Sequence, residues 1–496
     1  MREQPKGGGG GRFEPRGEAV RALDAVERRR TDSDEALKAA LDGHPGADPR
    51  DKALLNELVM GVLRMRGALD AEIAQASNRL IEEIDPLSLQ TLRVAAYQLL
   101  FLDRIPAHAA VNAAVEITKK RKTGRGVSGF VNAVLRKLSV RPPARTGTVS
   151  RHYQTPLDLE RPAKPSRDAE EGRAGGRRPE SLSHTPWLID LFVRQLGEAG
   201  ALSLCEANNR EPPFSIRAVG LKNSRDDLAR LLVEKEGIES SPGRFAPQSL
   251  ILKKGVNPAA SPSFAQGLWT VQDEAAQLVS LVLDPKPGER VLDACAAPGG
   301  KTAHIAELMH DRGKVVALDR DRKRLALVDE TIRRLGLSCV KTSMGDASRD
   351  LPLERGPFDR IVVDAPCSGL GTLRRSPEIK WRVTRDDVRD LAARQLAILE
   401  NLSKYLKPGG IMVYSVCTPT DEEGPGVVET FLSKTAGFRP SPIRSGLGLD
   451  PPVLLSAGPM LTTHDLRLGT AVVRTWPHLH GTDGFFIARL VKGTNP

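Results

Sequence analysis

The second half of the chain alternates short apolar runs with amphipathic stretches, and this alternation restricts the folds open to it. The apolar runs predict strands and the stretches between them predict helices. Strands alternating with helices build a parallel sheet with helices on its faces, a doubly wound α/β fold. Such sheets bind ligands at the carboxyl ends of their strands. Strands are predicted over residues 290–294, 315–319, 339–342, 358–364 and 411–415, helices near 302–309, 322–335 and 388–406, and a closing antiparallel pair over 470–475 and 485–490.

The first part of the chain has a different pattern. Apolar residues recur there at helical spacing from about position 17 to position 138, which predicts a compact all-helical domain. Proline and charge then dominate, which is typical of a flexible linker. Beyond it, strand-like residues 214–219 and 250–253 flank a helical stretch, 226–236. We therefore expect a multidomain α plus α/β protein, with a helical domain at 14–140, a linker at 141–182, a small α+β segment at 183–266 and the α/β domain at 267–496.

Charge and cysteine content indicate which partners, cross-links and cellular location to expect. The net charge is +11, and residues 101–150 hold ten Lys and Arg against two Asp and Glu. This local excess is explained equally well by a polyanionic partner and by a basic face exposed to solvent. Aromatics make up only 4%, so an extended base-stacking platform is not expected. Five cysteines without a C-x-x-C pair predict no disulfide framework and no metal site. With no signal peptide or membrane-length apolar run, we expect a cytoplasmic protein.

Acidic residues stand where three of the predicted strands end. Asp293 opens a turn of small residues, Asp293-Ala-Cys-Ala-Ala-Pro-Gly-Gly-Lys-Thr302, that runs directly into a predicted helix. Small side chains let the backbone approach a ligand, and a helix amino terminus offers free N–H groups. Asp319 ends the next strand, where an acid commonly accepts ribose hydroxyls, and Asp346 follows the third strand. These features predict a nucleoside cofactor.

Two cysteines at neighbouring strand ends point to a specific reaction. Cys367 lies three residues after Asp364, and Cys417 follows the next strand. A thiolate that adds to carbon 6 of cytosine makes carbon 5 nucleophilic enough to attack an electrophilic methyl group. A carboxyl group at the N3/N4 edge would stabilise the charge on the base, and a second polar group would assist release. The target base would have to leave its stack.

The motifs resemble those of RNA cytosine-5 methyltransferases, and most closely the bacterial RsmB/Sun (Fmu) type that modifies 16S rRNA. The resemblance rests on residues 292–302, on Asp364-Ala-Pro-Cys-Ser-Gly369 with Arg374-Arg-Ser-Pro-Glu-Ile-Lys-Trp381, on residues 269–277 and on Asp483-Gly-Phe-Phe486. Ala95-Ala-Tyr-Gln-Leu-Leu100 and Asn132-Ala-Val-Leu-Arg136 are similar to the NusB-like RNA-binding domain of this type. The family implies a NusB-like helical domain, a small RNA-binding subdomain and a Rossmann-like catalytic domain.

The resemblance also implies S-adenosyl-L-methionine as the methyl donor and assigns the site residues. Cys417 is then the nucleophile, Cys367 assists product release and Asp364 lies at the base edge. The donor is expected to contact the turn after the first strand and the strand-end acids: Cys295, Ala296, Ala297, Pro298, Gly299, Gly300, Lys301, Asp319, Asp346 and Asp364.

Basic residues in two regions are expected to contact the phosphates of 16S rRNA, in a monomer without a metal ion. They are Lys119, Lys120, Arg121 and Lys122 in the helical domain and Arg374, Arg375 and Lys380 after Cys367. The alternative for each is solvent-facing charge.

Two positions depart from the family pattern. Val416 replaces the usual threonine before the nucleophile, and Glu422-Glu423-Gly424 replaces Glu-Glu-Asn. These changes leave open a non-catalytic RNA-binding or ribosome-assembly factor on the same fold. A cytosine-5 methyltransferase acting on transfer RNA is a further alternative.

Overall fold

The computed structural model describes residues 13–120, 126–140, 182–351, 357–443 and 468–494. These residues form two compact units. The first contains the described residues up to Val140 together with 182–189 and Ser376–Trp381, and the second contains the remainder. The linker predicted at 141–182 lies outside the described residues except for Leu182. None of the helices in the described ranges is long and apolar enough to cross a membrane.

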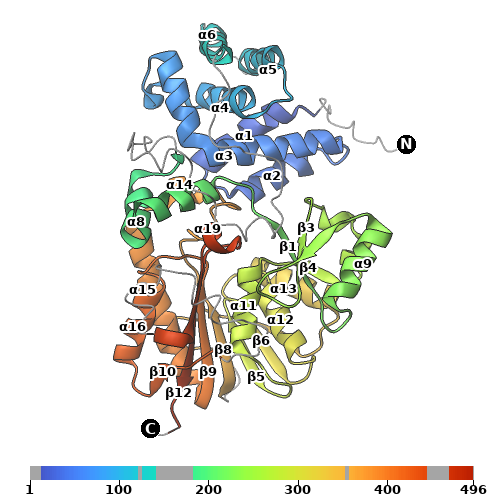
Figure 1. Cartoon of the computed structure of the whole chain (residues 1–496), viewed down its shortest axis with the longest axis vertical. Coiled ribbons are helices and arrows are strands. Elements are labelled where there is room, and N and C mark those ends of the chain that lie inside the picture. The colour runs from blue at the N-terminus through green and yellow to red at the C-terminus, as the bar shows by residue number, and fades with distance from the viewer. Residues whose placement is uncertain (1–12, 121–125, 141–181, 352–356, 444–467, 495–496) are drawn as a thin grey trace, which may run out of the picture. The chain divides into compact units, whose positions relative to one another are not determined.

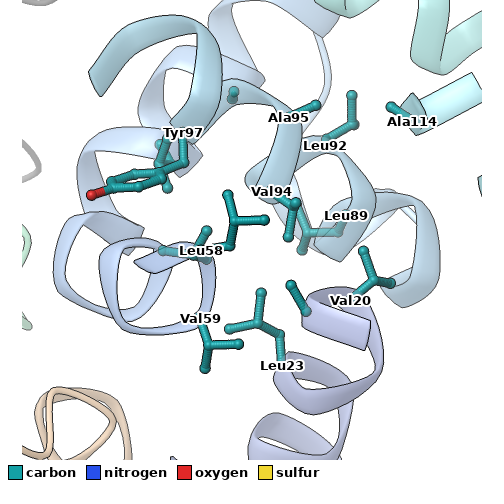
Figure 2. Close-up of a cluster of buried hydrophobic side chains, with 14 of the residues drawn as sticks. Val20, Leu23, Leu58, Val59, Leu89, Leu92, Val94, Ala95, Tyr97 and Ala114 are labelled. Carbon is teal, nitrogen blue, oxygen red and sulfur yellow. The ribbon is translucent and has the colours of Figure 1, made fainter. Parts of the chain in front are cut away.

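The first unit is helical, as its apolar spacing predicted. Two of its helices start with an aspartate followed by a proline. The Asp48 side chain, which precedes Pro49, accepts from the Arg50 N–H, and the Asp85 side chain, which precedes Pro86, accepts from the Ser88 N–H. Figure 2 shows side chains of its core, where the helices pack through leucine, valine and alanine. The helices are α1 (Pro15–Arg28), α2 (Ser33–Asp42), α3 (Pro49–Ser77), α4 (Pro86–Phe101), α5 (Ala107–Lys120) and α6 (Val127–Ser139).

A short segment from much later in the chain belongs to this helical unit. The Glu378 carboxylate accepts hydrogen bonds from the Ser33 N–H at 3.0 Å and the Ser33 hydroxyl at 3.1 Å. The Lys380 ammonium donates to the Arg64 carbonyl at 2.8 Å, and the Trp381 indole donates to the Leu63 carbonyl at 3.1 Å. Lys380 has no exposed surface. This corrects the expectation that Lys380 contacts phosphate, because its ammonium is buried and bonded to the protein backbone.

The second unit contains a small antiparallel sheet in the order β2-β3-β1-β4. Helix α9 (Arg225–Glu236) covers it, with Leu228 and Leu232 packed against Ile216 and Trp269. The strands are β1 (Phe214–Ala218), β2 (Ser240–Pro242), β3 (Ser249–Leu252) and β4 (Trp269–Val271). In the sequence, helix α8 (Pro186–Asn208) precedes β1, and helix α10 (Pro262–Ala265) lies between β3 and β4.

The large sheet has the order β10-β12-β9-β8-β5-β6-β7, with β11 paired to β12. Strands β5 to β9 are parallel and β12 is antiparallel to β9, which confirms the doubly wound fold and its closing antiparallel strands. The strands are β5 (Arg290–Ala294), β6 (Lys314–Asp319), β7 (Val340–Met344), β8 (Phe358–Asp364), β9 (Leu406–Val416), β10 (Phe438–Pro440), β11 (Val472–Thr475) and β12 (Phe485–Lys492).

Helices cover both faces of this sheet (Figure 1). Val291 and Val362 pack with α11 and α12 on one face, whereas Leu292 and Ile361 pack with α15 and α16 on the other. Because successive strand residues point to opposite faces, near-continuous apolar strands supply both cores. The α-helices in this part of the sequence are α11 (Glu274–Leu283), α12 (Gly300–Leu308), α13 (Arg322–Leu335), α14 (Ile379–Arg382), α15 (Arg385–Leu402), α16 (Pro425–Lys434) and α19 (Pro477–His480).

The close packing of α3 against α4 gives a prediction for stability. A Cβ atom at Gly61 would lie 2.1 Å from Cζ of Tyr97, a buried ring whose hydroxyl donates to Glu57. Gly61→Ala should therefore destabilise the protein by about 1–3 kcal/mol, as overpacking of a core does. Gly129→Ala is the control, because a Cβ at Gly129, within α6, meets nothing within 4 Å. Urea unfolding followed by circular dichroism would compare them; equal midpoints for the two variants would contradict this packing.

Candidate active site

The carboxyl ends of the parallel strands bring the predicted acids to one edge of the large sheet. Ala294 in β5 pairs with Leu318 in β6, so Asp293 and Asp319 end neighbouring strands. Asp364 ends β8 on the other side of β5. Asp346 follows β7, where the N–H of the preceding Gly345 donates to the Asp319 carbonyl at 3.1 Å. The four acids therefore lie along a single edge, as the strand pattern predicted.

The turn between β5 and α12 is built from small residues in unusual backbone conformations. Cys295 has a φ of 70°, and Gly299 has a φ of 105°. A Cβ atom at Gly299 would also lie 3.1 Å from the Cα of Val328, so the turn packs closely on α13. Helix α12 starts without a side-chain cap. Its first N–H groups are therefore available to a ligand, which fits the expected cofactor turn.

Two of the acids at this edge form hydrogen bonds that stabilise the turn between β5 and α12. Asp293 is buried, and its carboxylate accepts from the Thr302 hydroxyl at 2.6 Å. Burial, reinforced by the nearby Asp364 and Asp319, raises the pKa of Asp293 to about 7 although the Thr302 bond opposes this. Asp319 accepts from the Ala297 N–H at 3.3 Å. Asp293 therefore anchors α12, whereas Asp319 orders the turn itself.

Asp346 is a more exposed acid at the third strand end. Its carboxylate accepts from the Ser348 N–H at 3.0 Å and from the Ser348 hydroxyl at 2.7 Å. The bond from the Ser348 hydroxyl is the main reason that the pKa of Asp346 lies below its usual value. Asp346 is therefore an anionic acceptor near neutral pH.

Both predicted cysteines lie at this edge with their sulfur atoms in contact. The Sγ atoms of Cys367 and Cys417 are 3.2 Å apart. Asp364 lies beside them: its carboxylate accepts from the Lys301 ammonium at 2.6 Å and from the Ser415 hydroxyl at 2.8 Å. The cluster joins the strand ends of β8 and β9 to the first turn of α12.

The protonation of this cluster follows from its contacts. The hydrogen bond with Cys417, together with burial, raises the pKa of the Cys367 thiol well above its usual value, so this thiol keeps its proton. Burial lowers the pKa of Lys301, but the Asp364 carboxylate outweighs it and the pKa of Lys301 is raised overall. Cys417 also contributes to the raised pKa of Lys301, so the Lys301–Asp364 ion pair lies within electrostatic reach of this cysteine.

The two arginines that follow Cys367 bind protein groups. Arg375 forms ion pairs with Asp273 at 2.8 Å and with Asp483 at 2.7 Å. Arg374 is buried, and its guanidinium donates to the Gly481 carbonyl at 2.9 Å. This corrects the expectation that both arginines contact phosphate. Their charges instead connect the loop after Cys367 to the amino terminus of α11 and to the loop before β12.

The predicted basic run of the helical unit is only partly described. Lys119 and Lys120 are exposed at the end of α5, and Lys119 forms an ion pair with Glu116 at 3.0 Å. Arg121 and Lys122 lie outside the described residues. Within the described ranges, no group of His, Cys, Asp and Glu side chains could hold a metal ion.

The two departures from the family pattern both occupy packed positions. Val416 has no exposed surface, and it pairs with Phe486 of β12 in the core. A Cβ atom at Gly424 would lie 2.9 Å from the Thr420 carbonyl oxygen and 3.1 Å from the Phe486 ring. The surroundings therefore suit an apolar side chain at 416 and no side chain at 424.

A buried acid next to the cysteines is a site residue that the sequence pattern does not predict. Glu423 has no exposed surface, and its carboxylate accepts from the Ser368 N–H at 2.8 Å. It belongs to the Glu422-Glu423-Gly424 motif, but an acid in a polar stretch is usually exposed. Only the fold reveals that this acid is bonded to the residue after Cys367.

Models of known families match three parts of the chain. Residues 14–140 match the NusB family, and residues 184–258 match the ferredoxin-like domain of RsmF/B-like methyltransferases. Residues 280–491 match the family described as 16S rRNA methyltransferase RsmB/F, and these residues include all four strand-end acids and both cysteines.

Similarity to known proteins extends over nearly the whole chain. The probable ribosomal RNA small subunit methyltransferase B of Synechocystis sp. is 36% identical, covering 95% of this chain and 97% of the relative. The corresponding protein of Bacillus subtilis is 35% identical, over 96% of this chain and 98% of its own. The crystal structure of PH0851 superposes with a TM-score of 0.73 at 28% identity, covering 97% of this chain and 99% of that one. The chain therefore belongs to the RsmB/F family of 16S rRNA methyltransferases.

Proposed function

We propose that the protein transfers a methyl group from S-adenosyl-L-methionine to carbon 5 of a cytosine in 16S rRNA through a covalent cysteine–base intermediate. The observation that carries this proposal is the contact of the Cys367 and Cys417 sulfur atoms, 3.2 Å apart, beside Asp364. An ordinary methyl transfer to an already nucleophilic atom needs no thiol. Two thiols at the ligand-binding edge fit a base that must first be activated by addition.

Each residue of the cluster has a role in this chemistry. Cys417 forms a bond to carbon 6 of the cytosine, and the Lys301 ammonium stabilises the negative charge that this addition places on the base. The Asp364 carboxylate would accept from the N4 amino group at the N3/N4 edge. The bound methyl donor supplies an electrophilic methyl group for carbon 5. A base such as water then takes the proton from carbon 5. The electron pair of that C–H bond re-forms the C5–C6 double bond, and the bond between sulfur and carbon 6 breaks to release the Cys417 thiolate. Cys367, which lies in contact with Cys417, assists this release.

The methyl donor is assigned to the turn after β5 and the acids beside it. The small residues from Cys295 to Gly300 and the uncapped start of α12 suit close approach of a ligand. Asp319 would accept the ribose hydroxyls, and Asp346 would hold the adenine amino group. Lys301, in the first turn of α12, is bonded to Asp364, which ends β8 three residues before Cys367.

The RNA is assigned to the helical domain and the small α+β domain. Family matches to the NusB and ferredoxin-like domains support this division of labour. The exposed Lys119 and Lys120, with Arg121 and Lys122 beside them in the sequence, would contact phosphates. Arg374, Arg375 and Lys380 have no part in this assignment, because their charged groups bind protein atoms.

The proposal is tested by offering the protein S-adenosyl-L-methionine and unmodified 16S rRNA and mapping 5-methylcytosine by bisulfite sequencing. We expect one protected cytosine. If none is protected while a known cytosine-5 methyltransferase is active in parallel, the proposal fails. Protection confined to transfer RNA offered in the same way would move the assignment to that substrate.

The two cysteines are distinguished by substitution. Cys417→Ala should abolish methyl transfer, because no thiolate then adds to carbon 6, whereas Cys367→Ala should retain addition and accumulate a covalent RNA adduct. The readouts are transfer of a labelled methyl group and an SDS-stable protein–RNA band. Cys339→Ala is the control, because Cys339 lies before β7, away from the cluster, and should retain wild-type turnover. Turnover by Cys417→Ala would overturn the assignment of the nucleophile.

The basic run of the helical domain gives a prediction about salt. Replacing Lys119, Lys120, Arg121 and Lys122 by glutamine should reduce the slope of log affinity against log salt, by about 0.7 to 0.9 for each phosphate that these residues neutralise. RNA binding would be measured by filter retention from low to moderate salt. A slope equal to that of the unchanged protein would show that these residues carry solvent-facing charge only.

A further inference from the structure

Glu423 lies buried between the two segments that carry the cysteines. One carboxylate oxygen accepts from the Ser368 N–H at 2.8 Å, and the other accepts from the Ser368 hydroxyl at 2.5 Å. Ser368 is the residue after Cys367, and Glu423 follows Cys417 by six residues. The Ser368 hydroxyl also contacts the Thr418 hydroxyl at 3.2 Å, next to Cys417. The main chain beside one thiol is thus bonded to the loop that follows the other.

Gln395 of α15 extends this connection to the other side of Cys367. Its amide group donates to the Glu423 carboxylate at 2.9 Å and to the Pro366 carbonyl at 2.9 Å. The residues on both sides of Cys367, Pro366 and Ser368, are therefore held by Glu423 and its amide partner. Gln395, like Glu423, has no exposed surface.

Tyr414 anchors the same group to the strand that leads to Cys417. Its hydroxyl lies 3.0 Å from the Gln395 amide oxygen and 2.5 Å from the Glu423 carbonyl oxygen. Tyr414 is fully buried in β9, three residues before Cys417. Tyr414 consequently holds the main chain of Glu423 directly, and it holds the carboxylate indirectly, through the side chain of Gln395.

The chemistry of Glu423 is unusual for a group that only fills space. Among the described residues, no Lys, Arg or His side chain forms an ion pair with it, and burial raises its pKa although its hydrogen bonds oppose this. Burying a carboxyl group without a cation is costly, and an apolar side chain at such a position is commonly as stable or more so. A specific geometric task would explain why an acid occupies this site.

We propose that Glu423 is a positioning residue that holds the main chain around Cys367 against the turn after Cys417, and so sets the approach of the two thiols for product release. This inference rests on the proposed cytosine-5 reaction. In the described part of the chain, the hydrogen bonds of Glu423 go to Ser368, Gln395, Tyr414 and Thr420, and none goes to the expected cofactor turn or to Asp364. Its loss should therefore affect the release step, for which Cys367 must be placed, more than addition by Cys417.

The test is Glu423→Ala in the full-length protein. Without the carboxylate the Ser368 N–H loses its acceptor, and a displacement of about 1 Å at Cys367 is enough to lower turnover by up to roughly 10²-fold. We expect an SDS-stable RNA adduct to accumulate relative to wild type, with one round of methyl transfer and the affinity for S-adenosyl-L-methionine retained. Glu423→Gln should recover part of the turnover, because its amide oxygen can still accept from the Ser368 N–H.

Glu422→Ala is the matched control, because Glu422 is the exposed neighbour in the same turn and should behave as wild type.

If Glu423→Ala does not fold, Gln395→Leu decides, since it removes the bonds to Glu423 and Pro366 at similar volume. Accumulation of the RNA adduct in Glu423→Ala, or in Gln395→Leu where that variant is used instead, supports the inference. Wild-type turnover without adduct, or loss of both adduct and methyl transfer as in Cys417→Ala, would overturn it. Absence of an adduct in Cys367→Ala would instead reject the release role of Cys367, whereas the bisulfite map tests the cytosine-5 reaction itself.

Discussion

The parallel pairing of β8 with β9 is the interaction on which the active site depends. Its register sets Asp364 opposite Ser415, and the Ser415 hydroxyl donates to the Asp364 carboxylate at 2.8 Å. Because each cysteine follows its strand by one to three residues, this register brings two thiols 50 positions apart in sequence to 3.2 Å. A slip of one residue would turn the strand side chains to the opposite faces and separate the cluster. Sheet hydrogen bonding thus determines the geometry of the chemistry.

The positions of the strand-end groups could be predicted from the sequence because they follow from periodicity. Apolar runs separated by helical stretches predict a parallel sheet, and residues that end its strands must share an edge. Asp319, Asp346, Asp364 and both cysteines lie along that edge. What periodicity does not contain is the partner of each polar group. Glu423 reads as an ordinary surface acid until the fold brings Ser368 to it.

The partners of basic residues are equally hard to predict from the sequence. Arg374, Arg375 and Lys380 form a cationic segment that predicts contact with a polyanion. In the fold, Arg375 forms ion pairs with Asp273 and Asp483, which lie about 100 and 110 positions away in sequence, and Lys380 binds a backbone carbonyl. Local charge density cannot separate these outcomes, because a buried ion pair and a phosphate contact use the same side chains. The distinction lies in long-range partners that a single sequence does not reveal.

The segment Ser376–Trp381 within the helical unit has a consequence for how the protein is made. Ser33, Leu63 and Arg64 emerge early from the ribosome, whereas their hydrogen-bond partners are Glu378, Trp381 and Lys380, synthesised more than 300 residues later. At about 5–20 residues per second, this interval lasts some 15 seconds or more. Until the later segment is made, these hydrogen bonds of the helical unit cannot form. A polypeptide that ended after the linker would lack these hydrogen bonds permanently. The helical unit is therefore complete only late in translation.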